Sequence, residues 1–361
     1  MSTATSNKRV LVAPLDWGLG HATRCIPIIK KLLEAGCSVF IASDGPQLAL
    51  LKAEFDEAVR YLQLPGYRIS YSVSKRFLAL KILQQTPKIL QKINREHEWL
   101  QSVIDQHKID LVISDNRYGL YSSKVPCIFI THQLNIAAPF NRLRNLIRKI
   151  NYRFVNKYTV CWVPDTAAIK NISGELSHPC ELPRTPVKYI GLLNRLNPRA
   201  AQHTQYQWLI VLSGPEPQRT VLEKKLIQLI SKLEGKVLLA RGKPGSTERL
   251  DMPGNCVVAN HLTGNEMEEA FASSEFVVSR CGYTTVMELV AFRKKSVLIP
   301  TPGQTEQEYL ATHLMGQHWA YCCSQDDDLL LHFNNAQSFE YNFPSFNESG
   351  LDEAIQELID N

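Results

Sequence analysis

The sequence predicts an α/β protein with two parallel-sheet domains, and three observations support this fold class. The 361 residues are too many for one typical core and suit two domains of roughly 150 to 200 residues each. In both halves, short apolar runs of strand length alternate with segments of helical spacing. A stretch with faded periodicity and five prolines, residues 164–198, separates the two alternating series.

The first series predicts a parallel sheet, because strands that alternate with helices pair in parallel and are covered on both faces. It begins with a strand–helix–strand unit, whose helix ends before Gly36. A long helix follows, for which we expect an interruption near Pro87. The expected strands are 9–13, 38–42, 111–113, 127–130 and 159–163, and the expected helices are 22–35 and 78–107.

The second series repeats this alternation and ends in a separate helix. The expected strands are 208–212, 236–240, 256–259, 276–278 and 296–299, and the expected helices are 218–233, 267–272, one that starts at 283, and 350–359. We therefore expect a first domain at residues 1–190, a linker at 191–203, a second domain at 204–345, and a terminal segment at 346–361 that packs back across the domain junction.

Residues 279–288 are the most informative segment, because they join a strand end, a glycine turn and a helix start. Gly282 allows a sharp turn, and the amides of Thr284 and Thr285 open the helix, where phosphate groups bind. Glu288 follows Thr284 by about one turn, so its carboxylate suits ribose hydroxyls. The segment predicts a nucleotide clamp.

A second polar loop follows the strand at 296–299. It offers Thr301, Gln304, Glu306 and Gln307, whose oxygen and nitrogen groups suit the hydroxyls of a sugar. Both loops together predict a nucleotide sugar as the ligand.

These two segments, Ser-Arg-Cys-Gly-Tyr-Thr-Thr-Val-Met-Glu and Pro-Thr-Pro-Gly-Gln-Thr-Glu-Gln, resemble the carboxy-terminal signature of family 28-type glycosyltransferases. That group includes the UDP-N-acetylglucosamine transferase of peptidoglycan synthesis. The resemblance implies the GT-B architecture, two Rossmann-like domains with parallel sheets that face a central cleft. Two positions depart from the signature: Arg293 and Lys295 stand where such enzymes usually carry the Gly and Pro of a helix-to-strand turn.

The loop after the first strand carries a candidate catalytic histidine. Gly18 and Gly20 make a poor dinucleotide fingerprint, because the third glycine is missing at the expected spacing. The resemblance instead implies a Gly-x-Gly-His turn that meets the phosphates of the donor or the acceptor, with His21 in the site. The plainer alternative makes His21 an ordinary polar residue at a helix cap.

A glycosyl acceptor hydroxyl has a pKa far above neutrality, so a base that takes its proton aids the attack, and histidine titrates in the right range. Asp16 or Asp115 would orient the His21 imidazole or serve as the base. Asp115 and His132 both follow strands, where ligands of open α/β sheets gather. A loop cap is the alternative for Asp115.

Further nucleotide contacts are expected from other strand ends of the second domain. The loop after residues 208–212 resembles a small diphosphate-binding loop, Arg241 would offer a charged fork, and residues 258–262 stand where the resemblance places uracil. A solvent-facing arginine is the alternative for Arg241. The full predicted nucleotide-binding set is Ser213, Gly214, Arg241, His261, Arg280, Gly282, Thr284, Thr285 and Glu288.

The basic segment 142–157 interleaves arginine and lysine with apolar residues at helical spacing. It predicts either peripheral contact with an anionic membrane or a helix that packs on the sheet with its arginines in water. Family members often act on lipid-linked acceptors, which adds support to the membrane interpretation, and both interpretations stay open.

Composition excludes several classes of protein and site. A net charge of +5 gives no reason to expect nucleic acid as a partner, and the polar start without long apolar runs predicts a cytoplasmic protein, peripheral on the inner membrane face if the basic segment binds. The nine scattered cysteines predict reduced thiols in the core. We expect no metal and no cofactor besides the co-substrate UDP-sugar, and residues 326–328 are read as a solvated turn or helix start.

These inferences predict an inverting glycosyltransferase that moves a hexose or N-acetylhexosamine from a UDP-sugar to an acceptor hydroxyl, with a lipid-linked or cell-envelope glycan as acceptor. A UDP-sugar epimerase on the same fold and a non-catalytic nucleotide-sugar binding protein are the alternatives. A dehydrogenase that uses the first glycine loop ranks last. Donor sugar, acceptor and oligomeric state are left open.

Overall fold

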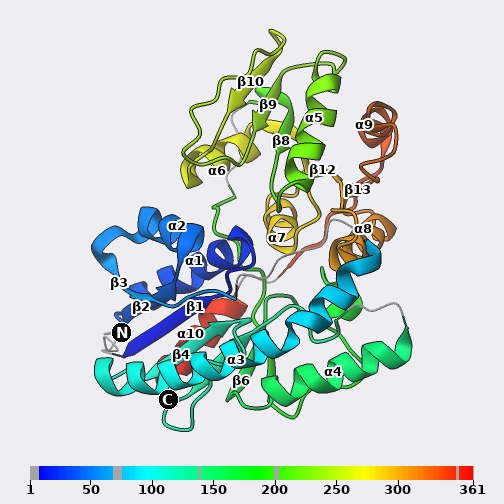
Figure 1. The fold of residues 1–361 in the computed structure, drawn as a ribbon. Coiled ribbons are helices and arrows are strands. Elements are labelled where there is room, and N and C mark those ends of the chain that lie inside the picture. The colour runs from blue at the N-terminus through cyan, green and yellow to red at the C-terminus, as the bar shows by residue number, and fades with distance from the viewer. Residues whose placement is uncertain (1–7, 68–74, 137–139, 199–202, 347–348, 361) are drawn as a thin grey trace. The chain divides into compact units, whose positions relative to one another are not determined.

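The computed structural model describes residues 8–67, 75–136, 140–198, 203–346 and 349–360. By its contacts the chain divides into two compact units (Figure 1). Unit 1 comprises Met1–Leu193 together with Phe346–Asn361, and unit 2 comprises Asn194–Ser345. The terminal segment therefore belongs to unit 1.

Unit 1 is built on a parallel sheet in the order β3-β2-β1-β4-β5-β6-β7. The strands are β1 (Arg9–Pro14), β2 (Ser38–Ser43), β3 (Arg60–Gln63), β4 (Leu111–Asp115), β5 (Cys127–Ile130), β6 (Val160–Val163) and β7 (Val187–Tyr189). Strand order reverses beside β1, which pairs with both β2 and β4. Ligands of such sheets bind at the carboxyl ends of the strands near this reversal.

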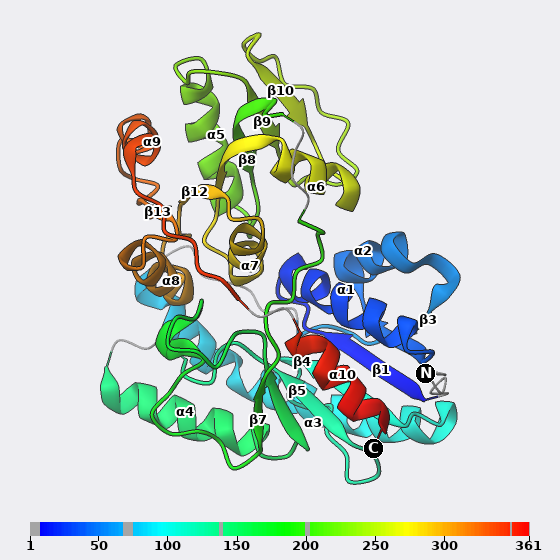
Figure 2. The ribbon, with the colours of Figure 1, turned by 180° about the vertical axis from the view of Figure 1, so that it is seen from behind.

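Helices cover both faces of the first sheet. They are α1 (Leu19–Glu34), α2 (Gly45–Phe55), α3 (Lys75–His107), α4 (Asn141–Val155) and α10 (Gly350–Asp360). In Figure 1, α3 lies in front of the sheet, and in Figure 2 it lies behind, whereas α10 is on the opposite side and contacts α1. An ion pair between Lys31 and Asp352 (Nζ–Oδ1 3.0 Å) joins α1 to α10.

Unit 2 repeats the architecture with a parallel sheet in the order β10-β9-β8-β11-β12-β13. Its strands are β8 (Tyr206–Val211), β9 (Val237–Ala240), β10 (Cys256–Ala259), β11 (Ser274–Ser279), β12 (Lys295–Leu298) and β13 (Tyr321–Cys322). Its helices are α5 (Gln218–Ile230), α6 (Gly264–Ala272), α7 (Tyr283–Ala291), α8 (Thr305–Gly316) and α9 (Leu329–Ser338).

Unit 1 also contains the 3₁₀ turns η1 (Asp56–Ala58) and η2 (Gly174–Leu176).

Each unit has its own hydrophobic core, made by the strands and the helices on them. Leu11, Phe40 and Phe129 are fully buried in the core of unit 1. In unit 2, Trp208 stacks between Phe276 and Phe333, with ring centroids 4.8 and 5.1 Å away. Side chains with no exposed surface hold the strands in fixed register, and this fixes the loops at their ends.

The structure confirms the two-sheet α/β fold and every predicted strand, and it corrects some expectations. The long helix α3 continues through Pro87, so the interruption expected there is not found. The sequence pattern gave no prediction for six elements: α2, α8, α9, β3, β7 and β13. All nine cysteines are free, as expected, but Cys180 is exposed and is not a core thiol.

Arg293, one of the two positions that depart from the signature, still makes a turn of the kind that suits glycine. Arg293 has a φ of 50°, in the left-handed region that favours glycine. Its guanidinium lies 5.9 Å from the ring centroid of Phe343, a cation–π contact that contributes to holding it there. In the part of the chain that the structure describes, no helix is long and apolar enough to cross a membrane.

Candidate active site

The carboxyl edge of the first sheet brings His21 and Asp115 together. Asp115 is the last residue of β4, where it pairs in register with Pro14 of β1, and the loop after Pro14 leads into α1. His21 is in the first turn of α1, and its Nδ1 lies 2.9 Å from Asp115 Oδ2. Asp115 is fully buried, whereas 14% of the His21 side chain is exposed. The carboxylate thus orients an imidazole that solvent reaches.

Arg24 completes this cluster and was not among the residues predicted from the sequence. It lies three positions after His21 on α1, and its side chain is only 2% exposed. Its Nε donates to Asp115 Oδ2 at 2.8 Å, and one terminal nitrogen donates to Asp115 Oδ1. The same nitrogen lies 2.8 Å from His21 Nδ1. The helical spacing of three residues was the available signal, since such residues share one helix face.

Burial and these charges shift both acid–base groups. Burial and the nearby Arg24 lower the pKa of His21 below its usual 6.5, although Asp115 acts in the opposite direction. Burial acts to raise the pKa of Asp115, but Arg24 and His21 outweigh it and lower that pKa to about 2. At neutral pH the cluster therefore holds a carboxylate and an uncharged imidazole, the state in which a histidine accepts a proton.

The other predicted residues of unit 1 occupy the same sheet edge with different contacts. His132 is buried after β5, with its Nδ1 3.0 Å from Arg24. The Asp16 carboxylate accepts a hydrogen bond from the Tyr67 amide at 2.9 Å. Gly18 precedes α1 with a φ of 81°, which explains glycine there, and the Gly20 carbonyl accepts from Thr23 Oγ1 at 3.0 Å. The structure thus joins His132 to the His21–Asp115 pair through Arg24.

A buried ion pair lies next to this carboxyl edge of the first sheet. Arg117 Nη1 lies 2.7 Å from Glu96 Oε1, with exposures of 0% and 5%. Arg117 Nε also donates to the carbonyl of Pro14 at 2.9 Å, just before the His21 loop. Tyr67 donates its hydroxyl proton to Glu96 at 2.6 Å. The pair fixes α3 against the loop that precedes α1, and neither residue was a sequence candidate.

In unit 2, α7 begins at the carboxyl end of β11, as predicted. Gly282 is its N-cap with φ −82° and ψ 138°, a conformation open to any residue, so the turn itself does not require glycine as we had expected. No heavy atom other than its chain neighbours lies within 4 Å of where a Cβ would stand. Thr284 and Thr285, in the first turn, are half-buried. The missing side chain leaves open space directly at a helix N-terminus.

Glu288 lies one turn further along α7 and is held by an arginine. Arg195 Nε lies 3.0 Å from Glu288 Oε1, and only 7% of the Glu288 side chain is exposed. Burial raises the pKa of Glu288 above its usual 4.5, while Arg195 acts against that rise. Arg195, on the segment that precedes β8, was not predicted from the sequence.

The predicted sugar loop is a turn that leads into α8. Gln304 is the N-cap of α8, and Glu306 and Gln307 lie in its first turn. Gln307 Oε1 accepts from the Thr301 amide at 2.8 Å, and Gln307 Nε2 donates to Gln304 Oε1 at 2.5 Å. Thr301 is 3% exposed, and its hydroxyl has no hydrogen-bond partner. The two glutamines are thus mutually oriented at the end of β12.

Of the remaining nucleotide candidates, Ser213, Gly214 and His261 lie exposed at the carboxyl ends of β8 and β10. Arg280 does not offer its guanidinium to solvent: it is 1% exposed and donates to the carbonyls of Gln218 at 2.8 Å and Pro300 at 3.2 Å. Burial lowers the pKa of Arg280 to about 10. Its contacts join the first residue of α5 to the loop after β12, so Arg280 holds these two segments together from the interior.

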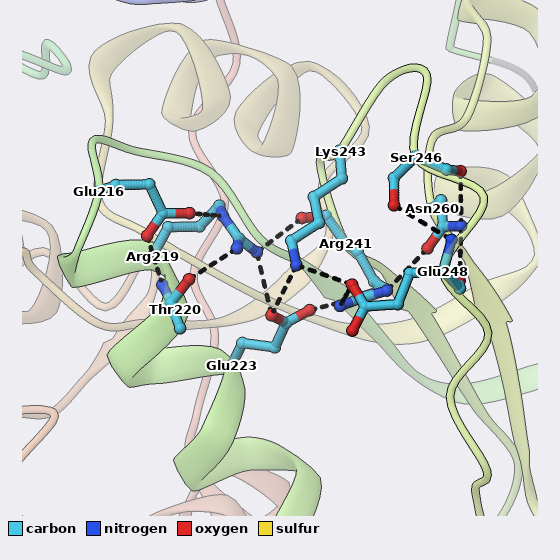
Figure 3. A network of polar contacts seen from close by, with 9 residues as sticks. All are labelled: Glu216, Arg219, Thr220, Glu223, Arg241, Lys243, Ser246, Glu248 and Asn260. Atoms are coloured by element: carbon cyan, nitrogen blue, oxygen red, sulfur yellow. Dashed lines mark hydrogen bonds and ion pairs between the residues drawn. The ribbon is translucent and has the colours of Figure 1, made fainter.

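Arg241 belongs to a network of charged groups (Figure 3). Its Nε lies 2.6 Å from the buried Glu223 Oε1, and its two terminal nitrogens contact Asn260 Oδ1 at 2.9 Å and Glu248 Oε2 at 3.0 Å. Arg219 approaches the second oxygen of Glu223 at 3.3 Å. Burial acts to raise the pKa of Glu223, but these cations lower it. All three guanidinium nitrogens of Arg241 therefore have partners within the protein.

The acidic run at residues 326–328 serves local structure, as expected. Asp328 caps α9 by accepting from the amides of Leu330 and Leu331, and Asp326 pairs with Lys225 at 2.8 Å. Within the described ranges, no group of three or more His, Cys, Asp or Glu residues is arranged to hold a metal ion.

The basic segment forms α4, which has a buried side and an exposed side. Tyr118 donates to the buried Asn151 at 2.8 Å, and Arg148 pairs with Glu181 at 2.7 Å. The exposed side carries both apolar and basic groups: Phe140, Arg142, Leu143, Leu146, Lys149, Ile150 and Arg153. Both features weighed from the sequence, packing on unit 1 and an amphipathic outer face, are thus present on one helix.

Comparison with known proteins links the chain to one enzyme group. Residues 220–332 match the model of the glycosyltransferase family 28 C-terminal domain. The UDP-N-acetylglucosamine–N-acetylmuramyl-(pentapeptide) pyrophosphoryl-undecaprenol N-acetylglucosamine transferase of Legionella pneumophila (strain Lens) is 23% identical over 304 residues, which cover 80% of this chain and 76% of that protein. An uncharacterized glycosyltransferase of Methanosarcina acetivorans is 25% identical over 337 residues, which cover 85% and 81%.

Solved glycosyltransferase structures share the fold over nearly the whole chain. The kitacinnamycin glycotransferase has a TM-score of 0.66 at 14% identity and covers 99% of this chain and 94% of its own. MurG of Acinetobacter baumannii has a TM-score of 0.56 at 18% identity, with 98% of both chains covered. Spinosyn rhamnosyltransferase SpnG, complexed with thymidine diphosphate, has a TM-score of 0.62 at 15% identity and covers 98% and 95%. At these identities the likeness concerns the fold alone.

Proposed function

We propose that this chain, a family 28-type glycosyltransferase with the GT-B fold, transfers a hexose or N-acetylhexosamine from a UDP-sugar to an acceptor hydroxyl. The observation that carries the proposal is the pair of His21 and Asp115, an uncharged, partly exposed imidazole oriented by a buried carboxylate. Such a pair suits removal of a proton from an attacking hydroxyl.

Unit 2 supplies the groups that suit the donor. The N-terminus of α7, with open space at Gly282, favours the diphosphate through the helix dipole and backbone amides. Glu288 has one carboxylate oxygen on Arg195, and its other oxygen suits a ribose hydroxyl. Gln304 and Gln307 suit the sugar. We propose UDP because the names of the relatives from Legionella and Clostridium give a UDP-sugar as their donor.

In the reaction, His21 Nε2 takes the proton of the acceptor hydroxyl while that oxygen bonds to the anomeric carbon. The bond from this carbon to the diphosphate oxygen breaks, and the electron pair leaves with UDP. A single displacement inverts the anomeric configuration. Asp115 stabilises the imidazolium that forms, and the α7 dipole stabilises the departing charge, so that we propose no metal and no further cofactor.

For the acceptor we propose a lipid-linked or cell-envelope glycan at the cytoplasmic face of a membrane. Two features support this: the named relatives act on a pyrophosphoryl-undecaprenol acceptor, and the outer side of α4 combines apolar and basic residues. Such a helix lies in the interface of an anionic bilayer, with apolar groups among the acyl chains and cations at the headgroups.

Two measurements test this proposal: the binding of different nucleotide sugars, and turnover after removal of the base His21. A thermal-shift panel of UDP-, GDP- and TDP-sugars should show stabilisation by UDP-sugars above the others. Turnover is then followed as release of UDP with and without a polyprenyl-pyrophosphate-linked acceptor. His21→Ala should cut kcat by about 10²–10⁴-fold while UDP affinity stays within a few-fold. Unchanged turnover of His21→Ala removes this residue from the chemistry, and consumption of UDP-sugar without acceptor supports an epimerase or hydrolase.

A further inference from the structure

The cluster around His21 contains a buried cation, Arg24, in direct contact with the imidazole. The charged and titratable groups that face His21 are Arg24 from α1 itself, Asp115 from β4 and His132 from the segment after β5. Arg24 contacts all three other members, through Asp115, His21 Nδ1 and His132 Nδ1. Only 2% of its side chain is exposed, so its contacts are with the protein interior.

We propose that Arg24 is a positioning residue that keeps His21 uncharged, so that Asp115 holds the one ring proton on Nδ1 and Nε2 is ready to receive the proton of the attacking hydroxyl. This inference rests on the proposed function in one respect only, that His21 is the base. The state of the imidazole itself is a property of the free protein.

The charges in the cluster explain why Arg24 is needed. A buried carboxylate alone beside a histidine forms an ion pair and holds the imidazole in its protonated form, which is useless as a base. Arg24 balances the charge of Asp115 through two hydrogen bonds to its two oxygens. His21 is left next to a neutral pair and is buried enough to remain uncharged. Asp115 keeps its orienting contact but no longer determines the charge of the ring.

The hydrogen-bond geometry assigns the tautomer. Arginine has donors only, so Arg24 at 3.0 Å requires an unprotonated Nδ1 on His132. At His21, Nδ1 has both an acceptor, Asp115 Oδ2 at 2.9 Å, and a donor, Arg24 at 2.8 Å. A proton on Nδ1 gives a charge-assisted bond to Asp115. Arg24 cannot donate to a protonated Nδ1, but the same terminal nitrogen keeps its hydrogen bond to Asp115. The Nδ1–H form therefore satisfies the buried carboxylate best, and it leaves the lone pair on Nε2.

The decisive measurement is ¹⁵N NMR titration of the His21 ring nitrogens in the full chain. In the unaltered protein we expect the uncharged Nδ1–H tautomer at pH 7. In Arg24→Met the titration midpoint should rise by about 1 to 3 pH units, because Asp115 is no longer balanced. In Arg24→Lys, which keeps the charge, it should stay close to that of the unaltered protein. An unchanged midpoint in Arg24→Met, or a proton on Nε2 in the unaltered protein, would overturn the proposal.

Because Arg24→Met leaves Asp115 buried without its cation, a second comparison does not depend on that variant folding. Asp115→Asn and the double variant Asp115→Asn/Arg24→Met both lack the carboxylate and differ only in the cation. The midpoint of Asp115→Asn should lie below that of the double variant. Equal midpoints would show that Arg24 does not act on the imidazole.

Kinetics separate this inference from the proposed function. In Arg24→Met the acid limb of the kcat/KM profile should move to higher pH by the same amount as the NMR midpoint, and activity lost at pH 7 should partly return at pH 9. A merely structural role would lower activity equally at all pH values. If His21→Ala keeps full turnover, the base assignment fails while the NMR result for Arg24 stands by itself.

Discussion

Arg195 Nε lies 3.0 Å from Glu288 Oε1, and this ion pair compensates a carboxylate that would otherwise be buried alone in unit 2. Arg195 is 20% exposed and comes from the segment before β8, whereas Glu288 is 7% exposed on α7. The pair thus anchors the start of unit 2 to the helix that we propose binds the nucleotide. Its electrostatics lead to a prediction about stability.

Arg195→Ala should destabilise the protein most at high pH. Burial raises the pKa of Glu288, and removing Arg195 removes the charge that opposes this rise. A carboxyl group with a raised folded-state pKa binds its proton more tightly when folded, so stability falls as pH rises from about 4.5 through the folded value. We expect a loss of about 1–3 kcal/mol at pH 8, below the roughly 3–5 kcal/mol for a fully buried pair, and less at pH 5.

Urea unfolding of Arg195→Ala at pH 5 and pH 8 measures this difference. The matched control is Arg195→Ala/Glu288→Gln, which has no charge to leave unpaired and should show little difference between the two pH values. Equal losses at both pH values in the single variant would mean that Arg195 contributes through packing of its side chain and not through its charge.

Gly282→Ala separates a ligand-binding role from a structural one. Gly282 has an ordinary φ of −82°, and a Cβ there meets no heavy atom within 4 Å. Stability should therefore change by no more than about 1 kcal/mol, the scale of an N-cap change. A phosphate at the α7 N-terminus would meet the new methyl group, so UDP affinity should fall about ten- to a hundredfold.

The control for this variant is Gly316→Ala at the end of α8, where a Cβ also meets nothing within 4 Å. It should leave both stability and UDP affinity nearly unchanged. Isothermal calorimetry with UDP and urea unfolding give the two readouts. Retention of full UDP affinity in Gly282→Ala would remove the α7 N-terminus from the donor site.

The parts of the fold that were predictable are those buried on both faces. The central strands β1, β4 and β5 are short apolar runs because no side of them meets water. The strands that escaped prediction, such as β3 and β7, lie at the edges of their sheet, and their residues are exposed or half-buried, so that hydrophobicity marks them weakly. Edge strands such as these depend on pairing with a neighbouring strand, and the local sequence pattern does not reveal that pairing.

Site residues were predictable where a side chain able to act as an acid or base follows a predicted strand. His21 and Asp115 follow strands of a parallel sheet, which brings their side chains to one edge, and the structure places them 2.9 Å apart. Arg24 was visible in principle through its helical spacing from His21. Arg195 was not, because its partner is 93 positions away and only the folded chain joins them.

The outer side of α4 should bind anionic membranes. Leu146 is 55% exposed among Arg142, Lys149 and Arg153. Burial of a leucine in the interface contributes about 1.5–3 kcal/mol, so Leu146→Glu should lower the partition onto phosphatidylglycerol vesicles at least about tenfold.

Vesicle sedimentation checks this prediction, with Leu331→Glu as the control. Leu331 is equally exposed, at 54%, but lies on α9 of unit 2. Binding of the unaltered protein should weaken with added salt and on phosphatidylcholine alone. The α4 assignment is refuted if Leu146→Glu binds as well as the unaltered protein, or if Leu331→Glu is impaired to the same extent.

Arg241→Met should destabilise unit 2 more than it weakens UDP binding. Arg241 is 2% exposed, and its nitrogens contact Glu223, Glu248 and Asn260, as Figure 3 shows. Without it, the buried Glu223 keeps only Arg219 and Lys243 as cationic partners. We expect a loss of about 2 kcal/mol or more in unfolding free energy, below the roughly 3–5 kcal/mol for a buried charge left with no partner.

The matched control is Lys243→Met, since Lys243 is 29% exposed and approaches Glu223 only at 3.7 Å. Its loss should be under about 1 kcal/mol, as for exposed ion pairs. Urea unfolding and UDP calorimetry on both variants distinguish the two roles of Arg241. If Arg241→Met lost UDP affinity at unchanged stability, Arg241 would act on the ligand and not on the fold. The diphosphate would then take the place of Glu248 on the Arg241 guanidinium.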